Sequence, residues 1–183
     1  MQLIPSHRGG ASVDSADTEK ISLVARLLPP ANVILDLDVA SKKRLFEQAG
    51  LLFENNHGIA RSQVFDALFA REKLGSTGLG HGIAIPHGRI KSLKEALGAF
   101  FRTKAPVPFE APDGLPVNLV FVLLVPERAT DFHLQILSEL AQMFSDRKLR
   151  ETLTSCSDPA MIHQLLSGWQ PHAPDQRSPA VSR

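Results

Sequence analysis

The chain has 183 residues, with 20 Lys and Arg against 19 Asp and Glu, which leaves a formal charge of +1 at pH 7. A protein that neutralises many nucleic-acid phosphates, or that is drawn to an anionic membrane surface, carries a basic excess. The balanced composition therefore argues against both partners. Since 43% of the residues are hydrophobic, the chain can bury one ordinary core, and we expect one folded domain.

The composition also bears on the compartment. The longest apolar run, residues 117–125, has nine residues and is interrupted by Asn118, whereas a membrane-spanning helix needs about 20. The N-terminus has no apolar stretch of the signal-peptide kind. The single cysteine, Cys156, cannot form an intramolecular disulfide, which is typical of a reducing compartment. We expect a cytoplasmic protein with no membrane insertion.

Both ends of the chain are predicted to be disordered tails. Residues 1–17 are rich in Ser, Asp, Gly and Ala without periodicity, and residues 169–183 contain three prolines. No internal repeat and no linker interrupts the segment between them. Residues 18–168 are therefore expected to form the folded unit.

The first half of that unit is predicted to be mainly helical. Residues 21–28 form a short helix candidate stopped by two prolines, and residues 31–37 form a strand candidate. A helix capped by Ser41 follows, with apolar residues on one face, and it ends before Gly58. A further helix is predicted over residues 61–73.

From residue 82 onward the pattern changes to short apolar runs. Strands are predicted over residues 83–85, 96–101 and 119–125, separated by turn residues such as Pro86-His87-Gly88. Further helices follow, with predicted N-caps at Thr130 or Asp131, Asp146 and Asp158.

The strand with the sequence LVFVLLV is continuously apolar, as expected for a central strand that is buried on both faces. Helices must then cover both sides of the sheet. The pattern predicts an α/β fold, a three-layer α/β/α sandwich in which helices flank a mixed sheet of about four to five strands.

The most unusual segment is LGSTGLGHGIAIPHGR, residues 74–89, which has four glycines in eight residues. Glycines at this density let a backbone approach a ligand closely or reach positive φ angles. The segment nevertheless fails both the P-loop pattern and GxGxxG, because His81 and Ile83 stand where lysine and the third glycine are required. The chain also lacks G-x-S-x-G. Neither nucleotide binding nor serine-hydrolase chemistry is predicted.

His87 is the residue of this segment that is suited to chemistry. Pro86 before it restricts the backbone, and Gly88 after it carries no side chain beside the ring. A neutral imidazole is available at pH 7 and is a good nitrogen nucleophile that can form a covalent intermediate. A phosphoryl group on such a nitrogen can be accepted and passed on.

The run REKLGSTGLGHGIAIPHG, residues 71–88, resembles the active-site segment of the mannitol/fructose-type enzyme IIA components of the bacterial phosphotransferase system. The nitrogen-regulatory branch is the most similar, and the resemblance extends over residues 18–168. It implies that His87 receives a phosphoryl group from a small histidine-containing phosphocarrier protein. It also implies a supporting role for Arg71 and for a second histidine, His133, in the run DFHLQIL.

These implied roles agree with the chemistry of the residues. Arg71 is permanently charged and can bind two phosphoryl oxygens, and His133 is expected in the first turn of a helix, where an anion is favoured. Backbone and hydroxyl donors of the same segment are expected to form a phosphoryl-binding loop, which consists of Gly75, Ser76, Thr77 and Gly88.

The remaining histidines are expected to be bystanders. His81 stands where relatives commonly carry asparagine, and we expect an interchangeable loop residue. A zinc site built from histidines is a minor alternative that no HExxH or paired-carboxylate pattern supports, so neither a metal nor a cofactor is predicted. His57 is expected in a turn, His163 on the polar side of the last helix, and His7 and His172 in the tails.

Three functions remain open at this point. The first is a regulatory phosphocarrier of the nitrogen-type system, whose phosphorylation state decides which targets it binds; the resemblance implies targets such as potassium transporters or sensor kinases. The alternative is a IIA subunit of a fructose- or mannitol-type uptake system that passes the phosphoryl group to a IIB cysteine. The third is a binding module of the same fold that has lost catalysis.

Overall fold

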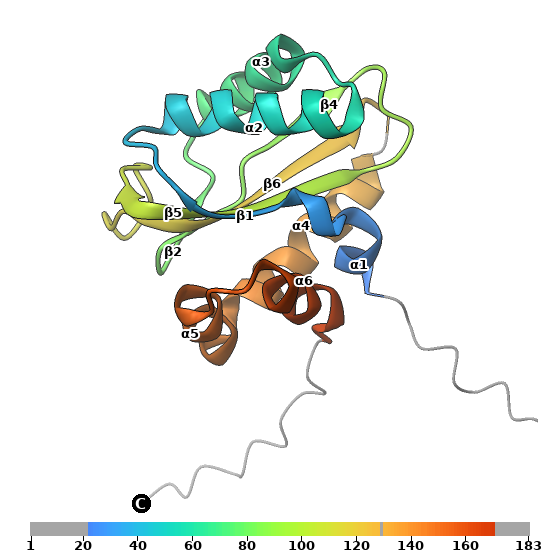
Figure 1. Ribbon diagram of the computed structural model, residues 1–183. Coiled ribbons are helices and arrows are strands. Elements are labelled where there is room, and N and C mark those ends of the chain that lie inside the picture. Colours follow the sequence, from blue (N-terminus) through green and yellow to red (C-terminus); the bar gives the residue numbers. More distant parts are fainter. Residues whose placement is uncertain (1–21, 129, 171–183) are drawn as a thin grey trace, which may run out of the picture.

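A six-stranded mixed sheet forms the middle of the molecule (Figure 1). The computed structural model describes residues 22–128 and 130–170. The strands are β1 (Val33–Leu37), β2 (Gly78–Gly80), β3 (Ile83–Ala84), β4 (His87–Ile90), β5 (Leu97–Val107) and β6 (Val117–Pro126). They lie in the order β1-β5-β6-β3-β2, and β4 also pairs with β6. The β5–β6 and β2–β3 pairs are antiparallel, whereas β1, β3 and β4 run parallel to their neighbours β5 or β6.

Helices cover both faces of this sheet (Figure 1). The helices are α1 (Leu23–Leu27), α2 (Lys42–His57), α3 (Arg61–Glu72), α4 (Thr130–Ser145), α5 (Arg147–Ser155) and α6 (Pro159–Gly168). The pair α2 and α3 packs on one face, and α1, α4, α5 and α6 lie on the other. The predicted three-layer α/β/α architecture with a mixed sheet is confirmed.

Two separate hydrophobic cores follow from this arrangement. Alternate residues of β6 point to opposite faces: Phe121 and Leu123 join the core under α4 and α6, whereas Val120 and Val122 join the core under α2 and α3. Each residue from 119 to 125 is at most 1% exposed. The continuous apolar run in the sequence is thus a central strand buried on both sides.

The predicted helix caps at Ser41, Asp146 and Asp158 lie where the sequence indicates, whereas Thr130 and Asp131, predicted as alternative caps, are already the first residues of α4. The Ser41 hydroxyl accepts the Arg44 N–H at the start of α2, and Gly58 ends that helix in the left-handed conformation with φ 68°. The carboxylates of Asp146 and Asp158 accept backbone N–H groups at the starts of α5 and α6. These local signals explain why the helices are predicted more accurately than the short strands.

The sheet has more strands than the four to five that the sequence suggests. β2 is missed because its sequence is Gly-Leu-Gly, and glycine has a low strand propensity. The predicted turn at Pro86-His87-Gly88 is instead the start of β4, in which His87 is paired with Leu123 of β6. β5 extends to Val107, beyond the predicted end at residue 101. A 3-10 turn, Pro30–Asn32, replaces the first part of the predicted first strand.

The predicted tails lie largely outside the described residues, since these exclude residues 1–21 and 171–183. Trp169, the first residue of the predicted C-terminal tail, is described. Its side chain is partly buried against the core, and its indole N–H points to the Asp146 carboxylate at 3.4 Å. Of the helices in the described part of the chain, none is sufficiently long and apolar to cross a membrane.

Candidate functional site

His87 is the first residue of β4, and two residues separate it from the end of β3. β3 and β4 both pair in parallel with β6, one after the other along it. Residues 85–86 lie between these two paired segments and interrupt them. At this break the His87 Nδ1 lies 2.9 Å from the Ile85 carbonyl oxygen. A carbonyl oxygen only accepts, so Nδ1 carries the proton and donates it. In the neutral ring Nε2 is therefore the nitrogen with a free lone pair.

His133, in the first turn of α4, packs against this imidazole. The ring centroids of His87 and His133 are 5.3 Å apart and their planes meet at 82°, an edge-to-face arrangement. His133 is only 9% exposed. The structure thus brings together the two histidines that the sequence singles out, one from the sheet and one from the helical layer below it.

Both imidazoles have a lowered pKa. Burial is the main cause of the lowered pKa of His87. Three smaller effects act on the same pKa: the hydrogen bond to Ile85 raises it, the charge of Arg71 lowers it, and the charge of Glu72 raises it. For His133, burial lowers the pKa most, followed by the charges of His87 and Arg89. Because each pKa falls below the ordinary value of 6.5, both rings are neutral at pH 7.

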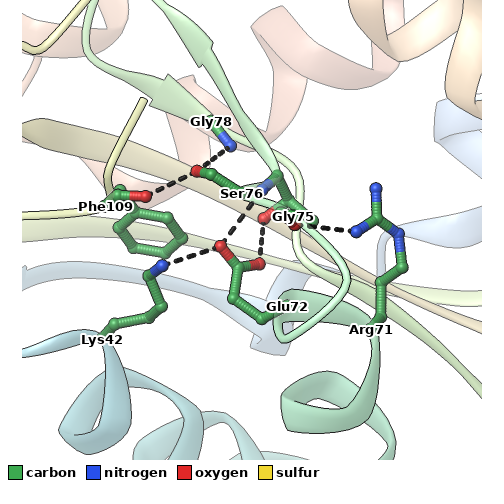
Figure 2. Close-up of polar contacts among 8 residues, drawn as sticks. Lys42, Arg71, Glu72, Gly75, Ser76, Gly78 and Phe109 are labelled. Carbon is green, nitrogen blue, oxygen red and sulfur yellow. Dashed lines mark hydrogen bonds and ion pairs between the residues drawn. The ribbon is translucent and has the colours of Figure 1, made fainter. Parts of the chain in front are cut away.

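Arg71 lies in the last turn of α3 and lines the same pocket as His87. Its Nη1 donates to the Gly75 carbonyl oxygen at 2.8 Å, which ties the side chain to the loop that follows the helix (Figure 2). A guanidinium has five N–H donors, so others remain for a ligand. The pocket has a volume of about 180 Å³ and is lined by Arg71, Ser76, Thr77, Gly78, Leu79, Ile85, His87, Leu137 and Ala141.

The hydroxyl groups of Ser76 and Thr77 both donate hydrogen bonds to other groups of the protein, and Figure 2 shows the contacts of Ser76. Ser76 Oγ donates to the Phe109 carbonyl oxygen at 2.5 Å and accepts the Gly78 N–H at 3.1 Å. Thr77 Oγ1 donates to Glu72 Oε2 at 2.6 Å. Both residues line the pocket, whereas Gly75 and Gly88, the other two members of the predicted loop, are not among its lining residues; the hydroxyl protons of Ser76 and Thr77 already have acceptors. The loop is held rigidly beside His87 by these contacts.

Gly88 has a packing reason for lacking a side chain. A Cβ at this position would lie 2.8 Å from the Ala67 Cβ and 2.9 Å from the Ala67 carbonyl carbon in α3. Strand alternation directs that Cβ to the face opposite the His87 ring. The glycine lets α3, with Arg71 at its end, approach β4 closely.

His81 is apart from this group. It is exposed in the connection between β2 and β3, has a φ of 55°, and its backbone N–H donates to Asp113 Oδ2 at 2.9 Å. It is not among the residues that line the pocket of His87. Within residues 22–128 and 130–170, no three His, Cys, Asp or Glu residues form a group that could hold a metal ion. The zinc alternative is therefore not supported.

Two of the predicted bystanders have structural partners. His57 is the last residue of α2 rather than part of a turn, and it contacts the buried side chain of Asn32 at 2.8 Å. The Nε2 of His163 lies 2.7 Å from the Leu28 carbonyl oxygen, so this half-buried ring links α6 to the end of α1. The predictions for His7 and His172 concern positions outside the described residues.

Comparison with known proteins identifies the family. The model of the family "Phosphoenolpyruvate-dependent sugar phosphotransferase system, EIIA 2" matches residues 26–169. The chain belongs to this EIIA family. The match covers every strand and all helices from α2 onward, together with His87, Arg71 and His133. The resemblance seen in the sequence is thus confirmed at the level of the family.

Relatives of this EIIA chain include nitrogen regulatory proteins. One from Pseudomonas aeruginosa is 41% identical over 142 residues, which are 77% of this chain and 92% of that protein. One from Bradyrhizobium diazoefficiens is 36% identical over 144 residues, or 79% of this chain and 94% of that protein. The crystal structure of the nitrogen regulatory protein IIA-Ntr from Neisseria meningitidis has 54% identity and a TM-score of 0.75, covering 79% of this chain and 99% of that one.

Two further residues near His87, Arg89 and Glu72, were not predicted from the sequence. Arg89 follows His87 by two positions in β4, so both side chains leave the same face of the strand, and its charge acts on His133. Glu72 directly follows Arg71 and is buried with an ion pair to Lys42. The period of two along β4 would have indicated Arg89. No sequence signal pairs Glu72 with Lys42, which comes from another helix.

Proposed function

We propose that this EIIA domain is a nitrogen-type regulatory phosphocarrier. Nε2 of His87 accepts a phosphoryl group from a histidine-containing phosphocarrier protein, and the phosphorylation state then regulates target proteins in the cytoplasm. The single observation that best supports this is the hydrogen bond from Nδ1 to the Ile85 carbonyl oxygen, because it leaves Nε2 as the nucleophile beside a pocket that contains Arg71.

The transfer balances without a cofactor or metal. The lone pair of Nε2 forms a bond to phosphorus while the bond from phosphorus to the donor histidine nitrogen breaks, and that nitrogen recovers the electron pair. The His87 ring becomes cationic during the transfer, and its Nδ1–H remains hydrogen-bonded to Ile85. The carbonyl dipole stabilises this charge. The lowered pKa of His87 favours the neutral, nucleophilic ring before transfer.

Arg71 and His133 have different tasks in this proposal. Arg71 stabilises the negative charge on the phosphoryl oxygens with a permanent positive charge. The His133 ring, edge-on to His87, fixes the ring plane and supplies an N–H group to a phosphoryl oxygen. Ser76 and Thr77 line the pocket, the Gly75 carbonyl oxygen holds the Arg71 side chain, and the glycine at 88 allows the close approach of α3.

The regulatory role is supported by the names of the relatives, which are nitrogen regulatory proteins. By resemblance, the targets belong to classes such as potassium transporters and sensor kinases. A fructose-specific EIIABC component of Bacillus subtilis is 30% identical over 145 residues, which are 23% of that protein. This similarity favours the second candidate, a IIA subunit that passes the phosphoryl group to a IIB cysteine.

Phosphorylation with phosphoenolpyruvate and the two upstream phosphotransferase proteins tests the proposal. We expect one acid-labile, alkali-stable phosphate on His87 and none on His87→Gln. His133→Ala should accept the group more slowly or lose it sooner. A wild-type chain that folds but takes up no phosphate would be a binding module instead. Efficient onward transfer to a purified sugar-specific IIB protein would favour the uptake role over the regulatory one.

A further inference from the structure

We infer that Glu72, with its charge balanced by Lys42, is the positioning residue that holds the His87 imidazole in its reactive tautomer. Its effect on phosphoryl transfer rests on the proposed function, whereas its effect on the ring can be measured independently. Glu72 touches no substrate in this inference. It acts through Thr77 and Ile85.

The Glu72 side chain is almost completely buried, with 4% of its surface exposed. Its carboxylate receives three contacts: from Lys42 Nζ at 2.9 Å, from the Thr77 N–H at 3.1 Å and from the Thr77 hydroxyl at 2.6 Å. A buried charge is tolerated only where it is paired and hydrogen-bonded. Because these partners satisfy the carboxylate, they also fix Thr77 at two of its atoms.

Thr77 connects this cluster to the imidazole. Its carbonyl oxygen accepts the Ile85 N–H at 3.0 Å, and the Ile85 carbonyl oxygen accepts the His87 Nδ1–H at 2.9 Å. Hydrogen bonds thus connect Glu72 to Thr77, Thr77 to Ile85, and Ile85 to the His87 ring. A displaced Thr77 would shift the residue that carries the acceptor for Nδ1, and the ring would lose the bond that selects its tautomer.

Lys42 joins the same cluster to a third part of the chain. It is the first residue of α2, and its ammonium group lies 4.9 Å from the centroid of the Phe109 ring. The Phe109 carbonyl oxygen in turn accepts the Ser76 hydroxyl. The loop is therefore held on one side by Glu72 and on the other by Phe109, and Lys42 contacts both (Figure 2).

The pairing with Lys42 also serves Arg71, the direct neighbour of Glu72 in the chain. Among the described residues Arg71 forms no ion pair, and its Nη1 bonds only to the neutral Gly75 carbonyl. Since Lys42 balances the charge of Glu72, the Arg71 charge stays available to a phosphoryl group. Glu72 thus supports the site in two ways: it positions Thr77, and its pairing with Lys42 leaves the Arg71 charge available.

Two readouts of Glu72→Gln separate positioning from general stability. The first is the tautomer of His87, observed by long-range 1H–15N NMR at a pH where the ring is neutral. The wild type should show the Nδ1–H form, and Glu72→Gln should show a mixture that includes Nε2–H. The second is phosphoryl transfer from the phosphocarrier, where kcat should fall about 10- to 100-fold while KM stays the same, because the docking surface is unchanged.

Thr77→Val and Thr77→Ser form a milder second pair. Thr77→Val removes only the hydroxyl contact to Glu72, and it should shift the tautomer and the rate in the same direction as Glu72→Gln. Thr77→Ser keeps a hydroxyl and should restore the Nδ1–H tautomer of His87. If Glu72→Gln fails to fold, this pair decides the inference.

Glu54→Gln is the matched control. Glu54 also pairs with a cation and accepts a backbone N–H, both from Arg61, at the junction of α2 and α3. This variant should leave the His87 tautomer and the transfer rate unchanged.

Retention of the Nδ1–H tautomer and the native kcat in folded Glu72→Gln, or in Thr77→Val, would overturn the inference. A changed tautomer in Glu54→Gln would also overturn it, because the effect would then be one of stability. If the wild type is never phosphorylated, the proposed function fails, whereas the NMR result still decides the role of Glu72.

Discussion

Gly88→Ala tests why a glycine stands beside His87. The added Cβ would lie 2.8, 2.9 and 3.0 Å from the Cβ, carbonyl carbon and carbonyl oxygen of Ala67. Two of these three atoms are backbone in the middle of α3, so no side-chain rotation relieves the contact. Overpacking of this kind costs about 1–3 kcal/mol. At 2–4 °C per kcal/mol for a chain of this size, the melting temperature should fall by about 2–12 °C.

Calorimetry or thermal circular dichroism measures this change, and Gly168→Ala is the control. At the end of α6 an added Cβ meets nothing within 4 Å, so that variant should match or slightly exceed the wild-type melting temperature. Since α3 carries Arg71, Gly88→Ala should also slow phosphorylation as α3 moves away from β4. Wild-type stability in Gly88→Ala would refute the packing argument, and loss of phosphorylation alone would instead indicate that the glycine serves access to the ring.

Two further predictions concern the histidines. His81→Asn should raise the free energy of unfolding by up to about 1 kcal/mol, because asparagine tolerates the left-handed backbone better, and should leave phosphorylation unchanged; lower stability in urea unfolding would contradict this. Burial lowers the pKa of His57, and likewise contributes most to the lowered pKa values of His87 and His133. Stability should therefore be complete above pH 6.5, the ordinary value of these groups, and decrease as the pH falls toward their folded-state values, because the unfolded chain then binds more protons. Urea unfolding between pH 8 and pH 5 measures the slope, which His57→Gln should reduce; a slope that is identical in the variant would refute the contribution of His57.

The helices and the central strand could be predicted because their signals are local. Ser41, Asp146 and Asp158 cap helices within three residues of their own position, and β6 is apolar throughout. β2 and β4 could not be predicted in the same way, because Gly-Leu-Gly and His-Gly-Arg-Ile form strands through pairing with β3 and β6, respectively.

The candidate site also has residues that could be predicted from local sequence and others that depend on contacts with distant parts of the chain. The resemblance in residues 71–88 indicates His87 and Arg71, and the structure places both at one pocket. The internal use of the Thr77 hydroxyl and the role of Glu72 were not predictable, since they depend on Lys42 of a separate helix and on burial. The reason for Gly88 depends likewise on Ala67 of α3.

The two hydrophobic cores on opposite faces of the sheet have a consequence for how the site is assembled. Arg71 comes from the layer that rests on one core, and His133 from the layer that rests on the other, while His87 belongs to the sheet between them. Detachment of either layer would separate members of the site without disturbing the opposite core. Under the proposed function, phosphorylation of His87 requires both layers to be docked at once, so a partly unfolded molecule would lose this activity before it is fully denatured.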